Sequence, residues 1–131
     1  SVAIPYFTDI KASAGNGYIN SEDKTSDFIV LPKSMISGKK LNAIKVYGDS
    51  MSPNIKPDSI ILIDLDKKEL KNNTVFALRC EDEVYVKRIE DHGDTILLKS
   101  DNIQYSTIVT KRNKIFIIGQ VVSTILDKNI E

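Results

Sequence analysis

Residues 75–99 read VFALRCEDEVYVKRIEDHGDTILLK, and this stretch decides the fold class. It contains three short runs rich in aliphatic and aromatic residues, at 75–80, 84–89 and 95–99, separated by polar segments. Glu81-Asp82-Glu83 and Asp91-His92-Gly93-Asp94 are short enough to join neighbouring antiparallel strands. We therefore predict two consecutive β-hairpins in this region.

The same pattern continues on both sides of these hairpins. Further short runs rich in Val, Ile and aromatic residues occur at 41–47, 59–64, 105–109 and 115–122, while helical periodicity is nearly absent. Residues 1–40 contain turn-forming polar and glycine residues and predict an irregular arm or linker. We expect a mostly antiparallel β domain of short strands at 41–131, entered through a linker at 1–40.

Composition limits the class of protein. The chain has 131 residues, of which 41% are hydrophobic, a length that suits one soluble domain with its own core. Its 18 basic residues balance its 18 acidic ones, so the chain is a poor candidate for holding nucleic acid by itself. No apolar run approaches the roughly 20 residues of a membrane helix, and the first residues do not resemble a secretion signal.

The single cysteine, Cys80, excludes an internal disulfide and a multi-cysteine zinc site. We expect it to be a small buried hydrophobic residue at the end of a strand. A chain with one cysteine is suited to a reducing compartment, and we expect a cytoplasmic location without a metal or cofactor.

One segment interrupts the β pattern, Gly48-Asp49-Ser50-Met51-Ser52-Pro53-Asn54-Ile55. Gly48 is expected to end a strand, and Ser52 followed by Pro53 predicts an N-cap with proline in the first helical position. A strand, a sharp turn and a short helical turn would expose Ser50 at a corner. Backbone N–H groups at such a corner are free of a sheet ladder and can bind an oxyanion.

A serine nucleophile needs a base. The only histidine, His92, lies in a polar turn, where a solvated side chain is expected. The alternative is lysine, which must be desolvated because its ordinary pKa is about 10.4. Strand alternation places Lys87 on one face with Tyr85 and Ile89, where burial would lower its pKa. The same pattern also fits an ordinary lysine that extends its charged end to solvent.

The segment around Ser50, the run Asp58-Ser59-Ile60-Ile61-Leu62-Ile63-Asp64 and Val86-Lys87-Arg88-Ile89 together resemble the LexA and phage-repressor family of self-cleaving proteins, the S24 peptidases. Upstream, Ala12-Ser13-Ala14-Gly15-Asn16-Gly17 resembles the family's Ala-Gly cleavage segment, although these residues also suit a flexible turn. Downstream, Ile118-Gly119-Gln120-Val121-Val122 resembles its terminal strand. The resemblance runs from about residue 12 to 125 and implies a β domain related to signal peptidases.

The resemblance implies a role for each matching residue. Ser50 would attack the carbonyl of Ala14, and neutral Lys87 would accept the hydroxyl proton and later protonate the amine of Gly15. Backbone N–H groups of Asp49 and Ser50 would stabilise the oxyanion. Residues 1–40 would then contain the cleavage arm, and Met51 is expected to pack beside the site.

The resemblance also implies partners. The family's members form dimers, and Ile115-Phe116-Ile117-Ile118 would be either a core strand or a dimer edge. A RecA filament would favour the docked arm, and operator DNA would be bound only through an N-terminal helix-turn-helix domain, which we expect to be absent from a chain that begins at Ser1.

Three functions remain compatible with the sequence. The first is the regulatory, self-cleaving and dimerising domain of a phage-type transcriptional repressor. The second is an accessory subunit of a translesion DNA polymerase that is trimmed by the same reaction. The third is an oligomerisation domain that never cleaves its own arm.

Overall fold

The structure, a computed structural model, describes residues 1–8 and 27–126. These residues form nine strands, a four-residue helix α1 (Lys33–Ile36) and a 3-10 turn η1 (Arg112–Lys114). The strands are β1 (Val2–Phe7), β2 (Asp27–Leu31), β3 (Leu41–Lys45), β4 (Ser59–Asp64), β5 (Thr74–Cys80), β6 (Glu83–His92), β7 (Thr95–Lys99), β8 (Ile108–Lys111) and β9 (Ile115–Leu126). The expected mostly β fold of short strands is confirmed.

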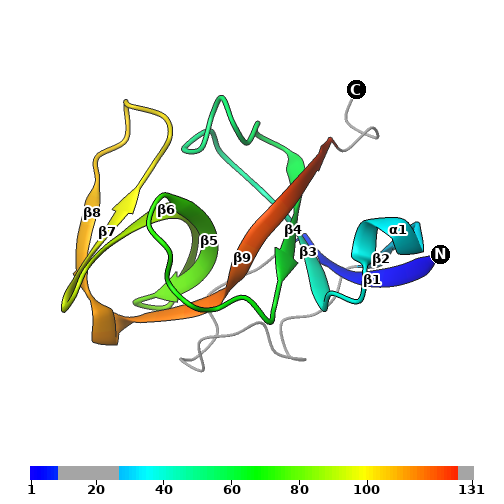
Figure 1. Cartoon of the computed structure of the whole chain (residues 1–131). Helices are drawn as coiled ribbons and strands as arrows, with labels where there is room; N and C mark the ends of the chain where they lie inside the picture. The colour runs from blue at the N-terminus through cyan, green and yellow to red at the C-terminus, as the bar shows by residue number, and fades with distance from the viewer. Residues whose placement is uncertain (9–26, 127–131) are drawn as a thin grey trace.

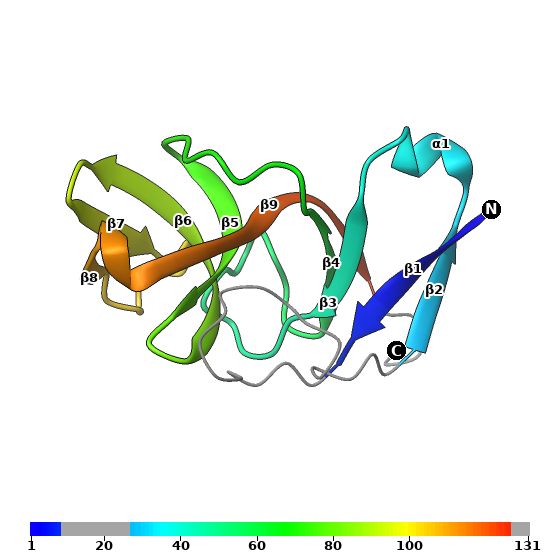
Figure 2. The same ribbon diagram turned by 90° about the horizontal axis from the view of Figure 1, so that it is seen from below.

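All nine strands belong to one sheet, in the order β2-β1-β3-β4-β9-β5-β6-β7-β8. Neighbouring strands are antiparallel except for β1 and β3, which run parallel. The long strand β9 pairs with β5 through its first half and with β4 through its second. It thereby links two groups of strands, β1–β4 on one side and β5–β8 on the other (Figures 1 and 2).

Three clusters of buried side chains fill the domain. One lies among β1–β4 and α1, one lies among β5, β6 and β7, and the third lies between these two. The third cluster contains Met51 and Ile55, which follow Ser50 in the chain, together with residues of β3, β4, β5 and β9. Met51 is 1% exposed, which confirms its packing role, and Cys80 is buried at the end of β5 as expected.

The two predicted hairpins are confirmed. β5 and β6 pair from Thr74–Ile89 to Cys80–Glu83, and β6 and β7 pair as far as His92–Thr95. The turn between β5 and β6 places both of its central residues in the left-handed region, Glu81 at φ 48° and Asp82 at φ 67°. Two positive φ values are what a tight turn needs in order to match the twist of its strands.

Because left-handed backbone is unfavourable for residues with a Cβ, the double variant Glu81→Asn, Asp82→Gly is expected to stabilise the domain. The expected gain in the free energy of unfolding is about 0.5–1 kcal/mol, measured by urea denaturation. The reversed pair, Glu81→Gly with Asp82→Asn, serves as a comparison of the same composition. A midpoint at or below that of the parent chain would contradict the turn geometry.

The expectation that residues 1–40 are irregular is wrong for the ends of that range. Residues 2–7 and 27–31 form β1 and β2, and α1 follows. β1 pairs with β2 along its length and with β3 at Tyr6 and Phe7. The physical reason is tertiary, because Ile4 and Leu31 become buried only when these strands meet the cluster that contains Leu62.

Two local predictions are also corrected. The strand expected at 105–109 is found at Ile108–Lys111, because Tyr105 bonds to Asn102 of its own loop and to Asp49 of the loop between β3 and β4. No helix with Ser52 as its N-cap forms, and residues 50–54 are turns with a cis peptide bond before Pro53. The Ile55 N–H donates to the Met51 carbonyl at 2.9 Å and closes the segment.

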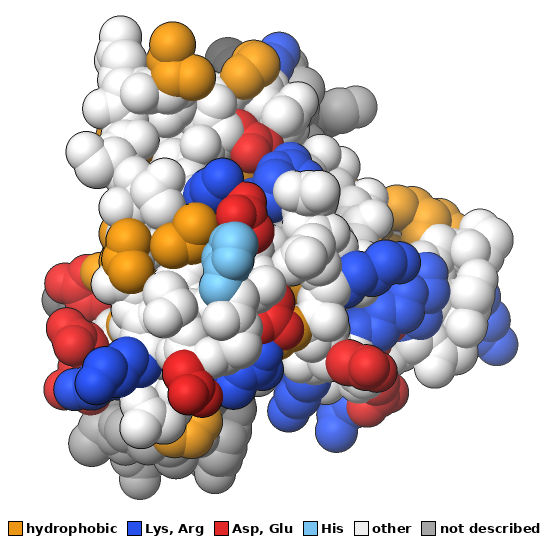
Figure 3. Space-filling model, turned by 60° about the vertical axis from the view of Figure 1, so that its left-hand side comes forward, with side chains coloured by type: hydrophobic (Ala, Val, Ile, Leu, Met, Phe, Trp, Pro, Cys, Tyr) orange, Lys and Arg blue, Asp and Glu red, His pale blue; other side chains and the backbone are white. Residues whose placement is uncertain are grey.

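Acidic and basic side chains are interspersed on the face seen in Figure 3, in keeping with the equal numbers of the two charges. Within residues 1–8 and 27–126, no helix has the length and apolar character needed to cross a membrane.

Candidate active site

Ser50 lies on the loop that leaves β3 and returns to β4. Gly48 precedes it with φ 77°, a conformation that glycine adopts readily. The Ser52 N–H donates to the Asp49 carbonyl at 3.1 Å, which closes a turn around Ser50. Burial of Met51 and Ile55 fastens this turn to the core, so Ser50, which is partly exposed, is held at a defined corner.

Lys87 lies on β6 and is only 7% exposed, as strand alternation predicted for a lysine on the inner face. Its Nζ donates to the Ser100 Oγ at 2.6 Å and lies 5.5 Å from the centre of the Tyr105 ring. Burial lowers the pKa of Lys87 below the usual value for lysine, because removal from water disfavours the ammonium form.

Ser50 and Lys87 line the same pocket. One wall consists of residues 44–47, 50 and 51, and the other consists of residues 84–87 of β6. The walls contain aliphatic side chains such as Val84 and Val86 beside the two polar groups. Ser50 and Lys87, 37 positions apart in the sequence, therefore line one concave site.

The loop between β7 and β8 adds contacts that the sequence did not indicate. The Asn102 side chain donates to the Asp49 carbonyl at 3.1 Å, and the Asn102 N–H donates to the Ser50 carbonyl at 3.0 Å. The Tyr105 hydroxyl donates to the Asp49 carboxylate at 2.5 Å. The loop is therefore hydrogen-bonded to the turn that carries Ser50, and its residue Ser100 is hydrogen-bonded to Lys87. The run Ser100-Asp101-Asn102 signals a polar loop in the sequence but gives no sign of its partners.

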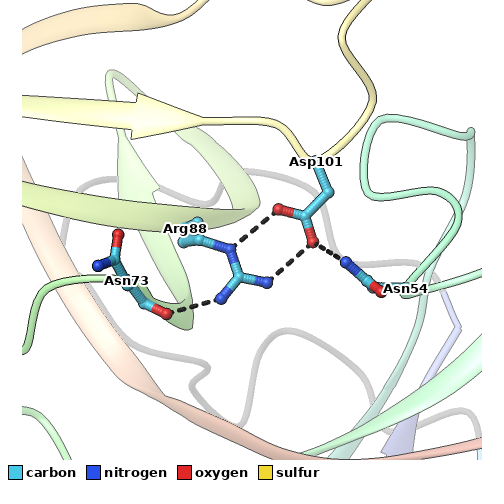
Figure 4. A network of polar contacts seen from close by, with 4 residues as sticks. All are labelled: Asn54, Asn73, Arg88 and Asp101. Carbon is cyan, nitrogen blue, oxygen red and sulfur yellow. Dashed lines mark hydrogen bonds and ion pairs between the residues drawn. The ribbon is translucent and has the colours of Figure 1, made fainter.

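An ion pair ties the same loop to β6 (Figure 4). The Arg88 guanidinium donates from Nε and Nη2 to the two oxygens of Asp101, each at 2.9 Å, and from Nη1 to the Asn73 carbonyl at 2.6 Å. Asn54, on the Ser50 side, donates to the same carboxylate at 2.8 Å. These hydrogen bonds, chiefly the two from Arg88, hold the pKa of Asp101 below its usual value.

The other predicted site residues lie elsewhere or outside the described part. The exposed His92 ring is 2.6 Å from a Glu90 oxygen, as suits the expected solvated histidine. Ala14 and Gly15 lie outside the described residues. However, Thr8, the last residue described before them, accepts a hydrogen bond from the hydroxyl of Tyr47, and Tyr47 lines the pocket.

A β domain that brings a serine on a tight turn and a desolvated lysine to one pocket has the components of a serine–lysine hydrolase. The comparison with known families agrees. Residues 5–122 match the family described as Peptidase S24-like, and the chain belongs to this family.

The curated relatives are bacterial regulators. The chain is 27% identical over 125 residues to LexA repressor 1 of Nocardia farcinica, covering 95% of the chain and 56% of that repressor. It is 39% identical over 66 residues to the LexA repressor of Mannheimia succiniciproducens, covering 50% of the chain and 31% of that repressor. An uncharacterised HTH-type transcriptional regulator of Haemophilus influenzae is 32% identical over 133 aligned positions, which cover 91% of the chain and 54% of that protein. The chain thus spans less than two thirds of each of these relatives.

Proposed function

We propose that this chain is the regulatory domain of a LexA-like or phage-type transcriptional repressor and that it cleaves its own arm between Ala14 and Gly15. The observation that carries the proposal is the pocket that Ser50 and Lys87 both line. Thr8 accepts a hydrogen bond from Tyr47, another residue that lines this pocket. Membership of the S24 peptidase family and the similarity to LexA repressors support it.

The proposed reaction is an acyl transfer. The Ser50 hydroxyl attacks the Ala14 carbonyl while neutral Lys87 accepts its proton. The C–N bond to Gly15 then breaks, and the lysine ammonium returns the proton to the leaving amine. Water, deprotonated by Lys87, hydrolyses the Ala14 ester and restores the serine. N–H groups of Asp49 and Ser50 are assigned to the oxyanion in both steps.

The direction of β1 supports docking of the arm at this pocket. β1 runs parallel to β3 and pairs Tyr6 with Ala43 and Phe7 with Ile44, so it advances in the same direction as the strand that leads to Ser50. Ala14 follows Thr8 by six residues. An extended chain of this length spans up to about 20 Å, which is enough to cross a small site.

The repressor assignment includes partners. We propose that the chain self-associates through β9, on which Phe116 is half exposed although it lies in an apolar run. The HTH-type regulator and the LexA repressors among the relatives favour operator binding through a separate N-terminal domain. A RecA filament is proposed to promote cleavage by favouring the docked arm, which is a shift between two conformations of one segment.

The test is the intact mass of the chain over time, at neutral pH and at about pH 10, with and without a RecA filament on single-stranded DNA. The expected products are residues 1–14 and 15–131, formed faster at the higher pH because less Lys87 is protonated. Ser50→Ala is expected to give no cleavage, whereas Ser52→Ala, in the same turn, cleaves. Cleavage of Ser50→Ala at this bond, or an intact parent chain under every condition, would contradict the proposal.

A further inference from the structure

The loop of residues 100–105 contacts both halves of the site. Ser100 accepts a hydrogen bond from the Lys87 Nζ, and the centre of the Tyr105 ring lies 5.5 Å from the same nitrogen. The Tyr105 hydroxyl and the Asn102 amide group hold Asp49, the neighbour of Ser50. One short segment therefore contacts the candidate base and the turn that carries the candidate nucleophile.

These contacts matter because a lysine that acts as a base has a demanding geometry. A neutral amine carries two N–H bonds and one lone pair, and rotation about the last C–N bond decides where the lone pair points. An acceptor that receives one N–H removes most of this freedom. At 2.6 Å the Ser100 Oγ is well placed to do so.

We propose that Ser100 is a positioning residue for Lys87: by accepting one N–H of the amine, it turns the lone pair toward Ser50. This inference rests on the proposed self-cleavage and adds to it a hydroxyl group that takes no part in bond making or breaking. The Arg88–Asp101 ion pair, at the residues next to Lys87 and Ser100, ties the loop that carries Ser100 to strand β6, which carries Lys87.

The same hydroxyl acts on the charge of Lys87. A hydrogen-bond acceptor stabilises the ammonium form and so opposes the effect of burial, which lowers the pKa of Lys87. The Ser100 variants keep every other titratable residue around the pocket and on the loop. These residues are Lys45, Tyr47, Asp49, Tyr85, Tyr105 and, beyond them, Arg88 with Asp101. Loss of the acceptor is therefore expected to move the pH dependence of cleavage to lower pH.

The experiment is the pH–rate profile of self-cleavage for the parent, Ser100→Ala and Ser100→Thr, with Ser106→Ala as a matched control on the same loop. Ser100→Ala is expected to reduce the rate on the alkaline plateau about ten- to a hundredfold and to lower the midpoint pH. Ser100→Thr keeps an acceptor and is expected to restore both, and Ser106→Ala leaves both unchanged. A profile of Ser100→Ala that superposes on the parent, or an equal loss in Ser100→Thr, would overturn the inference.

A second measurement does not depend on cleavage. In a Ser50→Ala background, the Lys87 side chain can be titrated by ¹³C NMR with and without Ser100→Ala. The pKa of Lys87 is expected to be lower in the double variant, and an unchanged or higher pKa would overturn the inference. If the parent chain never cleaves, the proposed function fails, and this titration still decides whether Ser100 controls the lysine.

Discussion

Replacing Lys87 with methionine is expected to abolish self-cleavage at every pH, in the presence or absence of a RecA filament. Methionine matches the length of the buried part of lysine but cannot accept the proton of Ser50. In the parent chain the cleavage rate is expected to rise with pH until Lys87 is neutral, because the protonated amine cannot act as a base. Burial lowers the pKa of Lys87, so this rise is expected at a lower pH than for an ordinary lysine. Intact-mass kinetics over a pH series would measure both effects.

Loss of folding can be separated from loss of chemistry in this variant. Unfolded Lys87 binds its proton more tightly than folded Lys87, because burial lowers the pKa only in the folded domain. The parent's stability should therefore rise as pH increases from the folded pKa toward the unfolded one. The Lys87→Met variant has no amine to deprotonate on folding, so it lacks this pH dependence of stability. It is expected to be at least as stable as the parent near neutral pH.

Lys99→Met is a suitable control, because Lys99 lies on the neighbouring strand β7 and pairs with Glu90 at 2.7 Å. It removes the same charge outside the pocket and is expected to cleave like the parent. A Lys87→Met chain that is folded and still cuts between Ala14 and Gly15 would remove Lys87 from its proposed role as the base.

Gly119→Ala is expected to destabilise the domain by about 3 kcal/mol. Gly119 lies on β9 where the strand changes partner, opposite Ala77 of β5 and next to Gln120, which pairs with both β5 and β4. A Cβ at this position would lie 2.3 Å from the Asp64 carbonyl oxygen and 2.7 Å from a methyl group of Ile63. Because the closer atom belongs to the backbone, relief requires the sheet itself to shift.

Urea denaturation of Gly119→Ala and Gly38→Ala separates this contact from backbone strain. Gly38 has φ +74° but open space around its missing Cβ, so its substitution costs only the left-handed conformation, about 1–2 kcal/mol. Gly119 is not in that region, and its cost comes from the collision alone. A smaller loss of stability at Gly119 than at Gly38 would contradict the close approach of β9 and β4.

Local patterns predicted much of the sheet. β4 and β7 match their expected ranges, and β5 and β6 differ from theirs only at their ends, because alternation and turn residues act over a few positions. β1 and β2 were not recognised, because they flank turn-forming residues and the burial of Ile4 and Leu31 depends on the tertiary cluster that contains Leu62. The strand predicted at 105–109 begins only at Ile108, because Tyr105, although aromatic, belongs to the loop and donates a hydrogen bond to Asp49.

From the sequence, the short strand-forming runs predicted the β class, and the order of the motifs singled out Ser50 and Lys87 as candidates through the family resemblance. Strand alternation put Lys87 on one face with Tyr85 and Ile89, and the fold shows that this face is buried at Lys87. The surroundings of both residues depend on tertiary contacts. Tyr105 reaches Asp49 across 56 positions and Ser100 reaches Lys87 across 13, both through a loop whose residues have no periodic pattern. A hydrogen bond forms only when the donor–acceptor distance falls within a window narrower than about 1 Å, whereas periodicity reports only which face a residue occupies. For this reason the faces could be predicted from the sequence, and the contacts that orient the pocket could not.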